Sequence, residues 1–343
     1  MTIKQRKKDH VDLTTSGKVD YKQATGFEQY RFIHNALPEV NMEDVTTEAT
    51  FLNRTFDFPL FISSMTGGYT DAGAVNAVIA EFCEEYNLPF GVGSQRIMLE
   101  DPEAISSFSI VRERAPNAFI ASNIGGAQLI GGLAKEKVEI LISSIKADAV
   151  IVHLNPLQEL MQPEGDRSFK GILSGIGQLV EDCELPVIVK ETGAGISAEV
   201  ARRLLDEGVR VIDIAGAGGT SWAKVENRRK SNRDPQDTFN DWGIPSAEAL
   251  LQTADLKKDF DFQLIASGGI RSSHDIAKSI CLGSDFSAAA QPVIKAIVDD
   301  GQSGLKKLYK NWKRQLTIIL TLLGCERLDD LKPKHVKLKR RDR

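Results

Sequence analysis

The sequence predicts an α/β fold in which eight parallel strands alternate with helices and close into a (β/α)8 TIM barrel. Short apolar, β-branched runs recur, most of them about 25 to 35 residues apart, which is the length of one strand plus one crossover helix. The runs are almost continuously apolar, as is typical of strands buried on both faces. Eight such units favour a closed barrel over an open sheet.

Each expected strand is followed by Gly, Ser, Asn or a charged residue and then by a helical pattern. The expected strands are Leu60–Ile62, Phe90–Val92, Phe119–Ala121, Val150–Val152, Val187–Val189, Val211–Ile214, Leu264–Ala266 and Phe286–Ala288. A doubly wound sheet is the alternative fold, and it predicts G-x-G-x-x-G after the first strand. The sequence has S-S-M-T-G-G at 63–68 instead, which favours the barrel.

The remaining segments fit around one barrel domain that spans residues 1–343. Residues 1–50 form an N-terminal arm that we expect to cover one barrel mouth. A long polar loop at 219–262 follows the sixth strand, and loops of this kind commonly act as lids. A final C-terminal helix is expected from about Leu305 to Leu323, followed by a solvated basic tail at 325–343.

Composition narrows the class of protein. The formal net charge of −4 argues against a nucleic-acid partner, because such proteins usually carry a basic excess. The four cysteines are far apart in the sequence, which suits reduced thiols and a cytoplasmic location. The longest apolar run, Leu316–Leu323, is too short to cross a membrane.

The residues after each strand should carry the chemistry, because barrel active sites lie at the carboxyl ends of the strands. This ring is rich in glycine and lacks both the paired carboxylates of a glycosidase and a zinc-binding cluster. The loops S-G-G-I-R at 267–271 and A-Q-P at 290–292 each open a helix. Glycines and helix N-termini suit a phosphate, and Lys190 can add a positive charge.

These loops together resemble the type 2 isopentenyl-diphosphate isomerase family. The shared motifs are R-K-K-D-H at 6–10, M-T-G-G at 65–68, G-S-Q-R at 93–96, S-N-I-G at 122–125, H-L-N-P-L-Q-E at 153–159, V-K-E-T-G at 189–193, G-G-T-S-W at 218–222 and S-G-G-I-R at 267–271. The resemblance implies an isomerase that interconverts isopentenyl and dimethylallyl diphosphate with reduced FMN and Mg²⁺, NADPH being a reductant of the flavin. It also implies a homo-oligomer, a tetramer or larger.

The resemblance assigns roles to residues at the matching positions. The FMN-binding residues would be Met65, Thr66, Gly67, Ser94, Asn123, Lys190, Thr220, Gly268, Gly269, Ile270, Arg271, Ala290 and Gln291. The residues in contact with the diphosphate substrate would be Arg6, Lys7, Ser94, Gln95, Arg96, His153, Asn155 and Gln158. His153 and Gln158 are the candidate catalytic residues, and Glu159 would bind the metal. His10 lies within the first motif, and both a contact role and no contact role are open for it.

Few side chains in the ring can exchange a proton, which favours the reduced flavin as the acid and base. A mechanism centred on His153 is the alternative. An FMN-dependent oxidoreductase acting on a small organic acid is a second possible function, but the fifth and sixth loops have no histidine to act as its base. A non-catalytic flavin sensor is a third, and it would not need the residues expected to bind diphosphate. Trp222 and Trp242 in the long loop are interpreted as packing residues.

Overall fold

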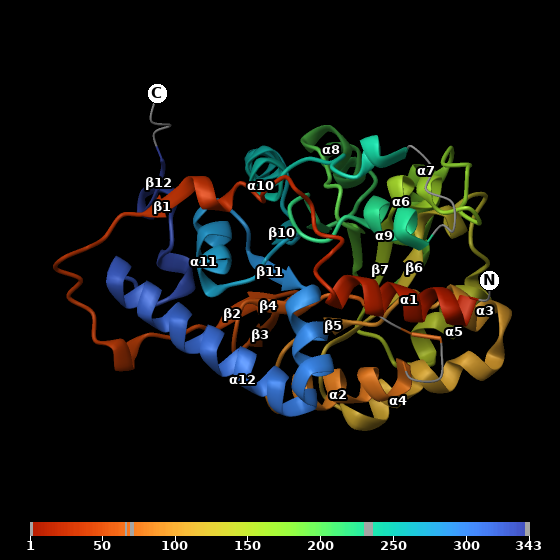
Figure 1. Ribbon diagram of the computed structural model, residues 1–343, viewed down its shortest axis with the longest axis horizontal. Coiled ribbons are helices and arrows are strands. Elements are labelled where there is room, and N and C mark those ends of the chain that lie inside the picture. Colours follow the sequence, from red (N-terminus) through yellow and green to blue (C-terminus); the bar gives the residue numbers. More distant parts are fainter. Residues whose placement is uncertain (1–2, 66, 69–71, 230–235, 340–343) are drawn as a thin grey trace.

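The computed structural model describes residues 3–65, 67–68, 72–229 and 236–339. Its centre is a closed barrel of eight parallel strands in the order β10-β11-β4-β5-β6-β7-β8-β9 (Figure 1). The strands are β4 (Leu60–Ile62), β5 (Phe90–Gly91), β6 (Ile120–Gly125), β7 (Ala149–Leu154), β8 (Val187–Glu191), β9 (Val211–Asp213), β10 (Gln263–Ala266) and β11 (Phe286–Ala289). Each strand coincides with one of the predicted apolar runs, so the predicted barrel is confirmed.

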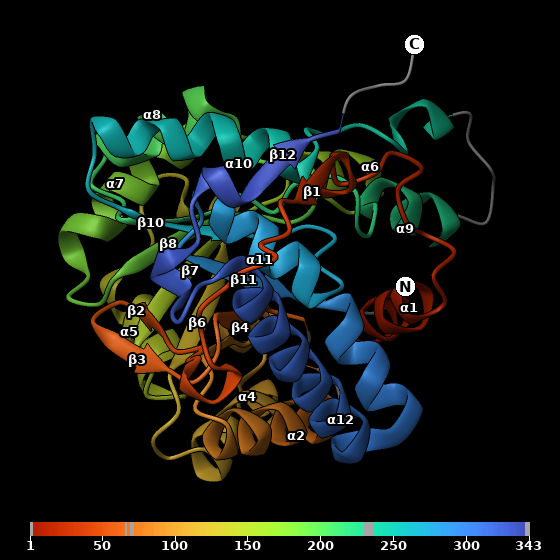
Figure 2. The same cartoon turned by 90° about the vertical axis from the view of Figure 1, so that its left-hand side faces the viewer.

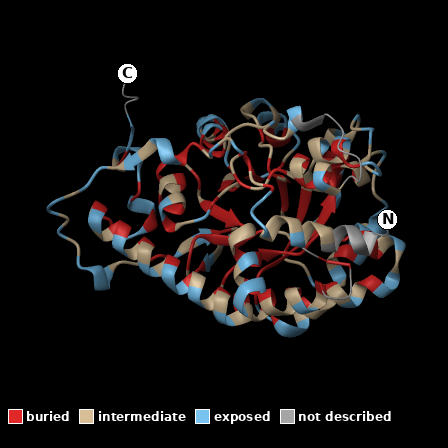
Figure 3. Ribbon diagram, in the orientation of Figure 1, coloured by how far each residue is buried: buried red, intermediate tan, exposed pale blue. Residues whose placement is uncertain are grey.

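Helices surround the barrel and leave their exposed faces outward, while the strands are buried (Figure 3). The helices are α1 (Ile3–Thr15), α2 (Ala72–Glu85), α3 (Arg96–Glu100), α4 (Ser106–Arg114), α5 (Lys135–Ser143), α6 (Pro156–Met161), α7 (Ile172–Asp182), α8 (Ala198–Asp206), α9 (Trp222–Arg229), α10 (Ser246–Ala254), α11 (Ser273–Cys281) and α12 (Gln291–Leu323). Non-helical backbone at Asp300 and Gly301 divides α12, so its second part corresponds to the predicted final helix. Among the described residues, no helix is long and apolar enough to cross a membrane.

Phenylalanines close the N-terminal end of the barrel. The hairpin of β2 (Ala49–Phe51) and β3 (Arg54–Phe56) places Phe51 and Phe56 against the barrel interior. Phe51 lies 5.3 Å from Phe286 and 5.8 Å from Phe119 between ring centroids, and all four rings are buried. Aromatic rings at these separations combine a large buried area with favourable edge contacts. This end is therefore a packed apolar core.

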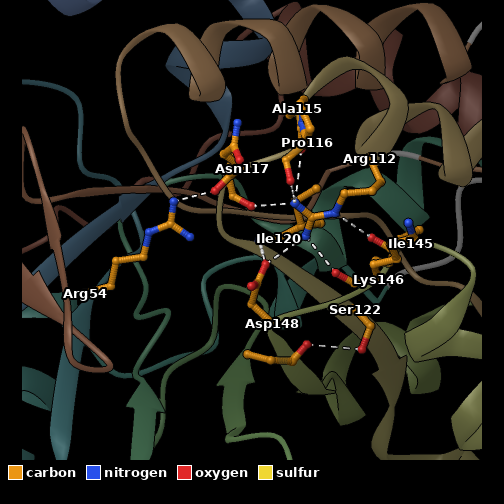
Figure 4. Close-up of polar contacts among 12 residues, drawn as sticks. Arg54, Arg112, Ala115, Pro116, Asn117, Ile120, Ser122, Ile145, Lys146 and Asp148 are labelled. Atoms are coloured by element: carbon orange, nitrogen blue, oxygen red, sulfur yellow. Dashed lines mark hydrogen bonds and ion pairs between the residues drawn. The ribbon is translucent and has the colours of Figure 1, made fainter.

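Arg112 braces the same end (Figure 4). Arg112 in α4 donates to the backbone carbonyls of Ile145, Lys146 and Ala118 at 3.1, 2.7 and 2.9 Å. It also pairs with Asp148 at 2.9 Å, and Asp148 accepts the backbone N–H of Ile120 at 2.8 Å. Arg112 therefore joins the segments that lead into β6 and β7.

The N-terminal arm reaches both ends of the barrel. Helix α1 contacts α9 and α12 near the C-terminal mouth, whereas the β2–β3 hairpin closes the opposite end (Figures 1 and 2). Between them, β1 (Tyr30–Phe32) pairs antiparallel with β12 (Val336–Leu338). The interpretation of the whole tail as solvated was therefore wrong, because β12 adds backbone hydrogen bonds and Val336 is buried.

The described parts of the long segment after β9 contain helices. They include α9 and α10 and buried residues such as Val225 and Leu250. The first of these helices lies beside α1 and α6 at the C-terminal mouth.

Candidate active site

A layer of polar side chains ends the barrel interior at the C-terminal mouth. Successive residues of a strand point to opposite faces, and Ile151 and Ile188 lie in the apolar interior of the barrel. Two positions further along, the same face carries His153 and Lys190, which are paired neighbours in the sheet. Asp213, the register partner of Lys190, continues this layer on β9. The interior of the barrel thus changes from apolar to polar over two residues of each strand.

A pocket opens above this layer, here called the mouth pocket. Its walls come from the loops after β4, β8, β9, β10 and β11, and α1 contributes His10, Val11 and Thr14. The predicted FMN residues that line it are Met65, Lys190, Thr220, Gly268, Gly269, Ile270, Arg271, Ala290 and Gln291. The structure therefore brings these residues, from five separate loops, to one site.

Glycines shape the floor of the mouth pocket because no larger residue fits there. Gly268 and Gly269 have φ angles of +90° and +75°, a region that side chains disfavour. A Cβ at Gly268 would lie 2.0 Å from the carbonyl oxygen of Gly216, and one at Gly269 would lie 2.4 Å from Thr25. The loops after β9 and β10 thus approach backbone to backbone. The first residues of α12, Gln291 and Pro292, line the pocket, and a helix N-terminus offers N–H groups to an anion.

A buried hydroxyl supports a polar ligand in the mouth pocket. Ser64 lines the pocket, and its Oγ is buried without a hydrogen-bond partner among the described residues. A buried hydroxyl that lacks a partner is costly, so a ligand atom that bonds to it would be favoured. The motif M-T-G-G begins one residue later, and sequence reasoning missed Ser64 because the motif did not include it.

Two buried carboxylates flank Lys190. Burial raises the pKa of Asp213, against the opposing charge of Lys190 and hydrogen bonds from Ser267 and the Ala215 N–H. Burial likewise raises the pKa of Glu191, against backbone N–H groups of the following turn and the charge of Lys190. Lys190 is only 7% exposed, so its charge acts at close range in a site with little water.

Asn123 on β6 and His153 on β7 meet beside Lys190. His153 Nδ1 lies 2.9 Å from Asn123 Oδ1, and the Asn123 side-chain amide donates to the carbonyl of Val92 at 3.0 Å. Asn123 is 4% exposed and does not line the mouth pocket, and neither do Gly67 and Ser94. The amide of Asn123 therefore orients the His153 ring.

Gln95 requires a correction. Its predicted contact with substrate is not provided, because the side chain is fully buried between β6 and the surrounding helices. Its Nε2 donates to the carbonyl of Leu141 at 3.0 Å, and its Oε1 accepts the backbone N–H of Asn123 at 2.8 Å. Gln95 supports Asn123, and through it His153, from behind. The motif G-S-Q-R could not show that Gln95 turns inward while Arg96 stays exposed.

The loop after β7 carries a connected set of polar groups. The Asn155 side-chain amide donates to Gln158 Oε1 at 3.2 Å and to Glu159 Oε1 at 2.9 Å. Glu159 Oε2 accepts the backbone N–H of Asp166 at 2.8 Å, and Arg96 reaches the Asp166 carboxylate at 3.3 Å. Four predicted substrate or metal residues are therefore linked. His153 and Asn155 also line a second, mostly apolar cavity against α7 and α8.

Glu226 is a buried carboxylate that the sequence did not reveal. It lies in α9 and is fully buried, with hydrogen bonds from Gln158 Nε2 at 3.1 Å, from His10 Nε2 at 2.9 Å and from Arg229. Burial opposes its ionisation, but the hydrogen bond and charge of His10, with Arg229 and Gln158, lower its pKa below the ordinary value. Trp222 was interpreted as a packing residue, yet it lines the mouth pocket.

Three predicted site residues cannot be placed in full. Thr66 lies outside the described residues, and the side chains of Arg6 and Lys7 are not described, although both belong to α1. Within the described ranges, no group of three or more His, Cys, Asp and Glu side chains could hold a metal ion. Glu159 would thus have to share a metal with oxygen atoms from a ligand.

Comparison with known proteins places this geometry in a family. Residues 154–338, more than half of the chain, match the family described as FMN-dependent dehydrogenase. The isopentenyl-diphosphate delta-isomerase of Chlorobium limicola is 42% identical, with 98% of this chain and 96% of that protein covered. The isomerase of the same name from Nostoc sp. is 41% identical, with 95% and 93% covered.

Solved structures share the fold at low sequence identity. The flavin-binding domain of baker's yeast flavocytochrome b2 superposes with a TM-score of 0.71 at 15% identity, over 97% of this chain and 90% of that chain. A mandelate oxidase mutant with benzaldehyde gives a TM-score of 0.68 at 17% identity, over 98% and 97%. The fold, together with 42% identity to an isomerase over nearly the full length of the chain, confirms the resemblance seen in the motifs. The chain belongs to the isopentenyl-diphosphate delta-isomerase family, within the wider group of FMN-dependent TIM-barrel proteins.

Proposed function

We propose that this protein interconverts isopentenyl diphosphate and dimethylallyl diphosphate, with reduced FMN and Mg²⁺ bound at the C-terminal mouth. The observation that carries the proposal is the meeting of two groups of residues at one mouth. A glycine-lined pocket with a buried cation lies on one side. The linked Asn155, Gln158 and Glu159 lie on the other, joined to the pocket through Glu226 and His10.

The residues of the mouth pocket fit FMN. The positive-φ glycines 268 and 269 and the start of α12 would hold the phosphate, and Lys190 and Ser64 would contact the flavin. Met65, Thr220, Ile270, Arg271, Ala290 and Gln291 complete the lining. Thr66, Gly67, Ser94 and Asn123 remain predicted contacts that rest on the family resemblance. When bound and reduced, FMN would supply acid/base chemistry through its ring nitrogens.

The diphosphate would be bound by cations and one metal ion. Mg²⁺ commonly takes one or two carboxylates and completes its shell with phosphate oxygens and water, so Glu159 is a sufficient protein ligand. Arg6 and Lys7 in α1 and the exposed Arg96 would add positive charge, since guanidinium groups bind phosphate in two-point contacts. His153 and Gln158 would donate hydrogen bonds to the substrate, and Asn155 would contact it while its amide holds Gln158 and Glu159.

The side chains near the substrate would position it, and the flavin would exchange the proton. His153 is held by Asn123, and Gln158 is held between Asn155 and Glu226. In the alternative mechanism His153 is itself the general acid or base. The variant His153→Gln separates the two, since general acid–base catalysis typically contributes about 10²- to 10⁴-fold. We expect a loss of kcat below about 100-fold with FMN and substrate still bound, and a loss of about 10⁴-fold would favour His153.

Three further proposals complete the account. NADPH would bring the flavin to its reduced form, and the isomerisation itself would cause no net redox change. The protein would work as a homo-oligomer, for which the exposed Ile33, Leu37, Met42 and Leu322 offer apolar surface. A cytoplasmic location would suit its four free cysteines. Light scattering on the purified protein tests the second of these.

The activity is tested by anaerobic incubation with FMN, a chemical reductant, Mg²⁺ and isopentenyl diphosphate in deuterated water, followed by NMR. We expect dimethylallyl diphosphate that carries deuterium, formed only when the flavin is reduced and Mg²⁺ is present. A yellow protein that retains FMN but forms no product would contradict the proposal and leave an FMN-dependent oxidoreductase or a flavin sensor to be tested.

A further inference from the structure

Among the described side chains of the N-terminal helix, His10 makes a part-buried contact with the barrel mouth. His10 Nε2 of α1 lies 2.9 Å from Glu226 Oε1 of α9, and the two side chains are 16% and 0% exposed. The Trp222 ring meets the His10 ring edge-on, with centroids 5.0 Å apart and planes at 75°. Trp222 and Glu226 are one turn apart in α9, so the two residues hold the same imidazole. The sequence of α1 is strongly polar, so this contact is important for holding the helix in place.

The same carboxylate fixes the orientation of Gln158. A carboxylate only accepts hydrogen bonds, so Gln158 must present its Nε2 to Glu226 Oε1, at 3.1 Å. Its Oε1 then faces the Asn155 amide at 3.2 Å, and Asn155 also donates to Glu159 Oε1 at 2.9 Å. An unbroken path of hydrogen bonds therefore runs from the arm to the candidate metal ligand.

We propose that His10 and Glu226 are a positioning pair, here called the arm latch, that fixes α1 against the loop and first turn of α6 that carry Asn155, Gln158 and Glu159. The inference rests on the proposed function and deepens it. Arg6 and Lys7 precede His10 by one turn of α1, whereas Glu159 belongs to the barrel. One diphosphate can be bound by both sets only if the arm and the loop keep a fixed relation. The arm latch supplies that relation before the substrate arrives.

The arm latch acts on how often α1 opens. A helix at a chain terminus opens more readily than the barrel it covers. The arm latch reduces the open fraction, so less of the binding energy for diphosphate is spent on ordering the arm. Opening the arm latch therefore weakens diphosphate binding and leaves the FMN phosphate site unchanged.

The test uses the FMN-loaded protein with Mg²⁺ and inorganic pyrophosphate as the probe. The variant His10→Phe keeps a ring against Trp222 and removes the donor, whereas His10→Gln keeps a donor near the position of Nε2. Calorimetry gives the pyrophosphate Kd, and hydrogen exchange of peptides from residues 3–15 gives the opening of the arm. We expect His10→Phe to raise the Kd roughly tenfold and speed exchange, and His10→Gln to restore much of both.

A double variant and a matched control sharpen the result. The double variant His10→Phe/Glu226→Gln should bind pyrophosphate no more weakly than the weaker-binding single variant, because the effects of two coupled residues are not additive. The same substitution at the exposed His34, His34→Phe, should change neither the pyrophosphate Kd nor the hydrogen exchange of the arm. Unchanged arm exchange in His10→Phe, or strictly additive effects, would overturn the arm latch. Hydrogen exchange of the arm can be measured without substrate. If the wild type neither binds pyrophosphate nor isomerises, that result counts against the proposed function alone, and the exchange data still test the arm latch.

Discussion

The two ends of the barrel are built from opposite chemistry. The N-terminal end is closed by Phe51 and Phe56 on a hairpin and braced by Arg112. The C-terminal end carries buried polar groups, including Lys190, over a floor of glycine backbone. Stability at the first end comes from filled space, whereas the second end keeps space open by excluding side chains. Removing side-chain atoms should therefore lower stability at the N-terminal end, and adding side-chain atoms should weaken ligand binding at the C-terminal end.

Truncation at the closed end should have the largest effect on stability. Phe51 is fully buried against three other rings, and removing a large buried ring costs about 3–5 kcal/mol. We expect Phe51→Ala to lose that amount in chemical unfolding followed by circular dichroism, with an unchanged FMN Kd. A tenfold weaker FMN affinity would show that the two ends are not independent.

Loss of the arginine brace should be somewhat less severe. Arg112→Leu keeps part of the side-chain packing but leaves several backbone carbonyls and Asp148 without their donor. Buried acceptors left unpaired cost about 1–3 kcal/mol each, reduced where water reaches them. We expect a loss of roughly 2–4 kcal/mol in the same unfolding experiment. An unchanged unfolding midpoint would contradict the assignment of Arg112 as a structural brace.

At the open end, removal of charge should affect binding more than folding. Lys190→Met keeps the length of the side chain and removes a cation beside two buried carboxylates, whose pKa values burial already raises. Asp213 and Glu191 can then take up protons, which limits the loss of stability. We expect FMN to bind roughly 10- to 100-fold more weakly, since hydrogen bonds to charged groups contribute about 1.5–3 kcal/mol. Equal FMN affinity in fluorescence titrations would remove Lys190 from the site.

The barrel and its glycine loops could be predicted because both depend on local sequence. A strand buried on both faces must be apolar throughout, as at 187–189, and a loop that brings backbones together must contain glycine, as at 268–269. Even β5, with only two residues, was found from its place in the repeat. These signals need no knowledge of distant contacts.

The residues that sequence reasoning missed depend on contacts between distant elements. Gln95 turns away from the mouth because Leu141 and Asn123 offer it partners, and nothing in G-S-Q-R records those partners. Glu226 lies in a run of charged residues that is typical of a solvated loop. The spacing of Trp222 and Glu226, four residues apart, was the available signal, since it places both on one helix face. That the face is buried depends on α1, which is distant in sequence.

The most direct test of the central claim, that the glycine floor of the C-terminal mouth binds FMN, is a fluorescence titration of the apoprotein with FMN. Gly268→Ala places a Cβ where Gly216 lies 2.0 Å away, whereas at Gly73 a Cβ would make only an ordinary contact of 3.7 Å with Ser107. With folding of both variants verified by circular dichroism, we predict that Gly73→Ala binds FMN like the wild type. Gly268→Ala should bind at least about 100-fold more weakly, a loss of roughly 2.7 kcal/mol. FMN binding to a folded Gly268→Ala with wild-type affinity would contradict the claim.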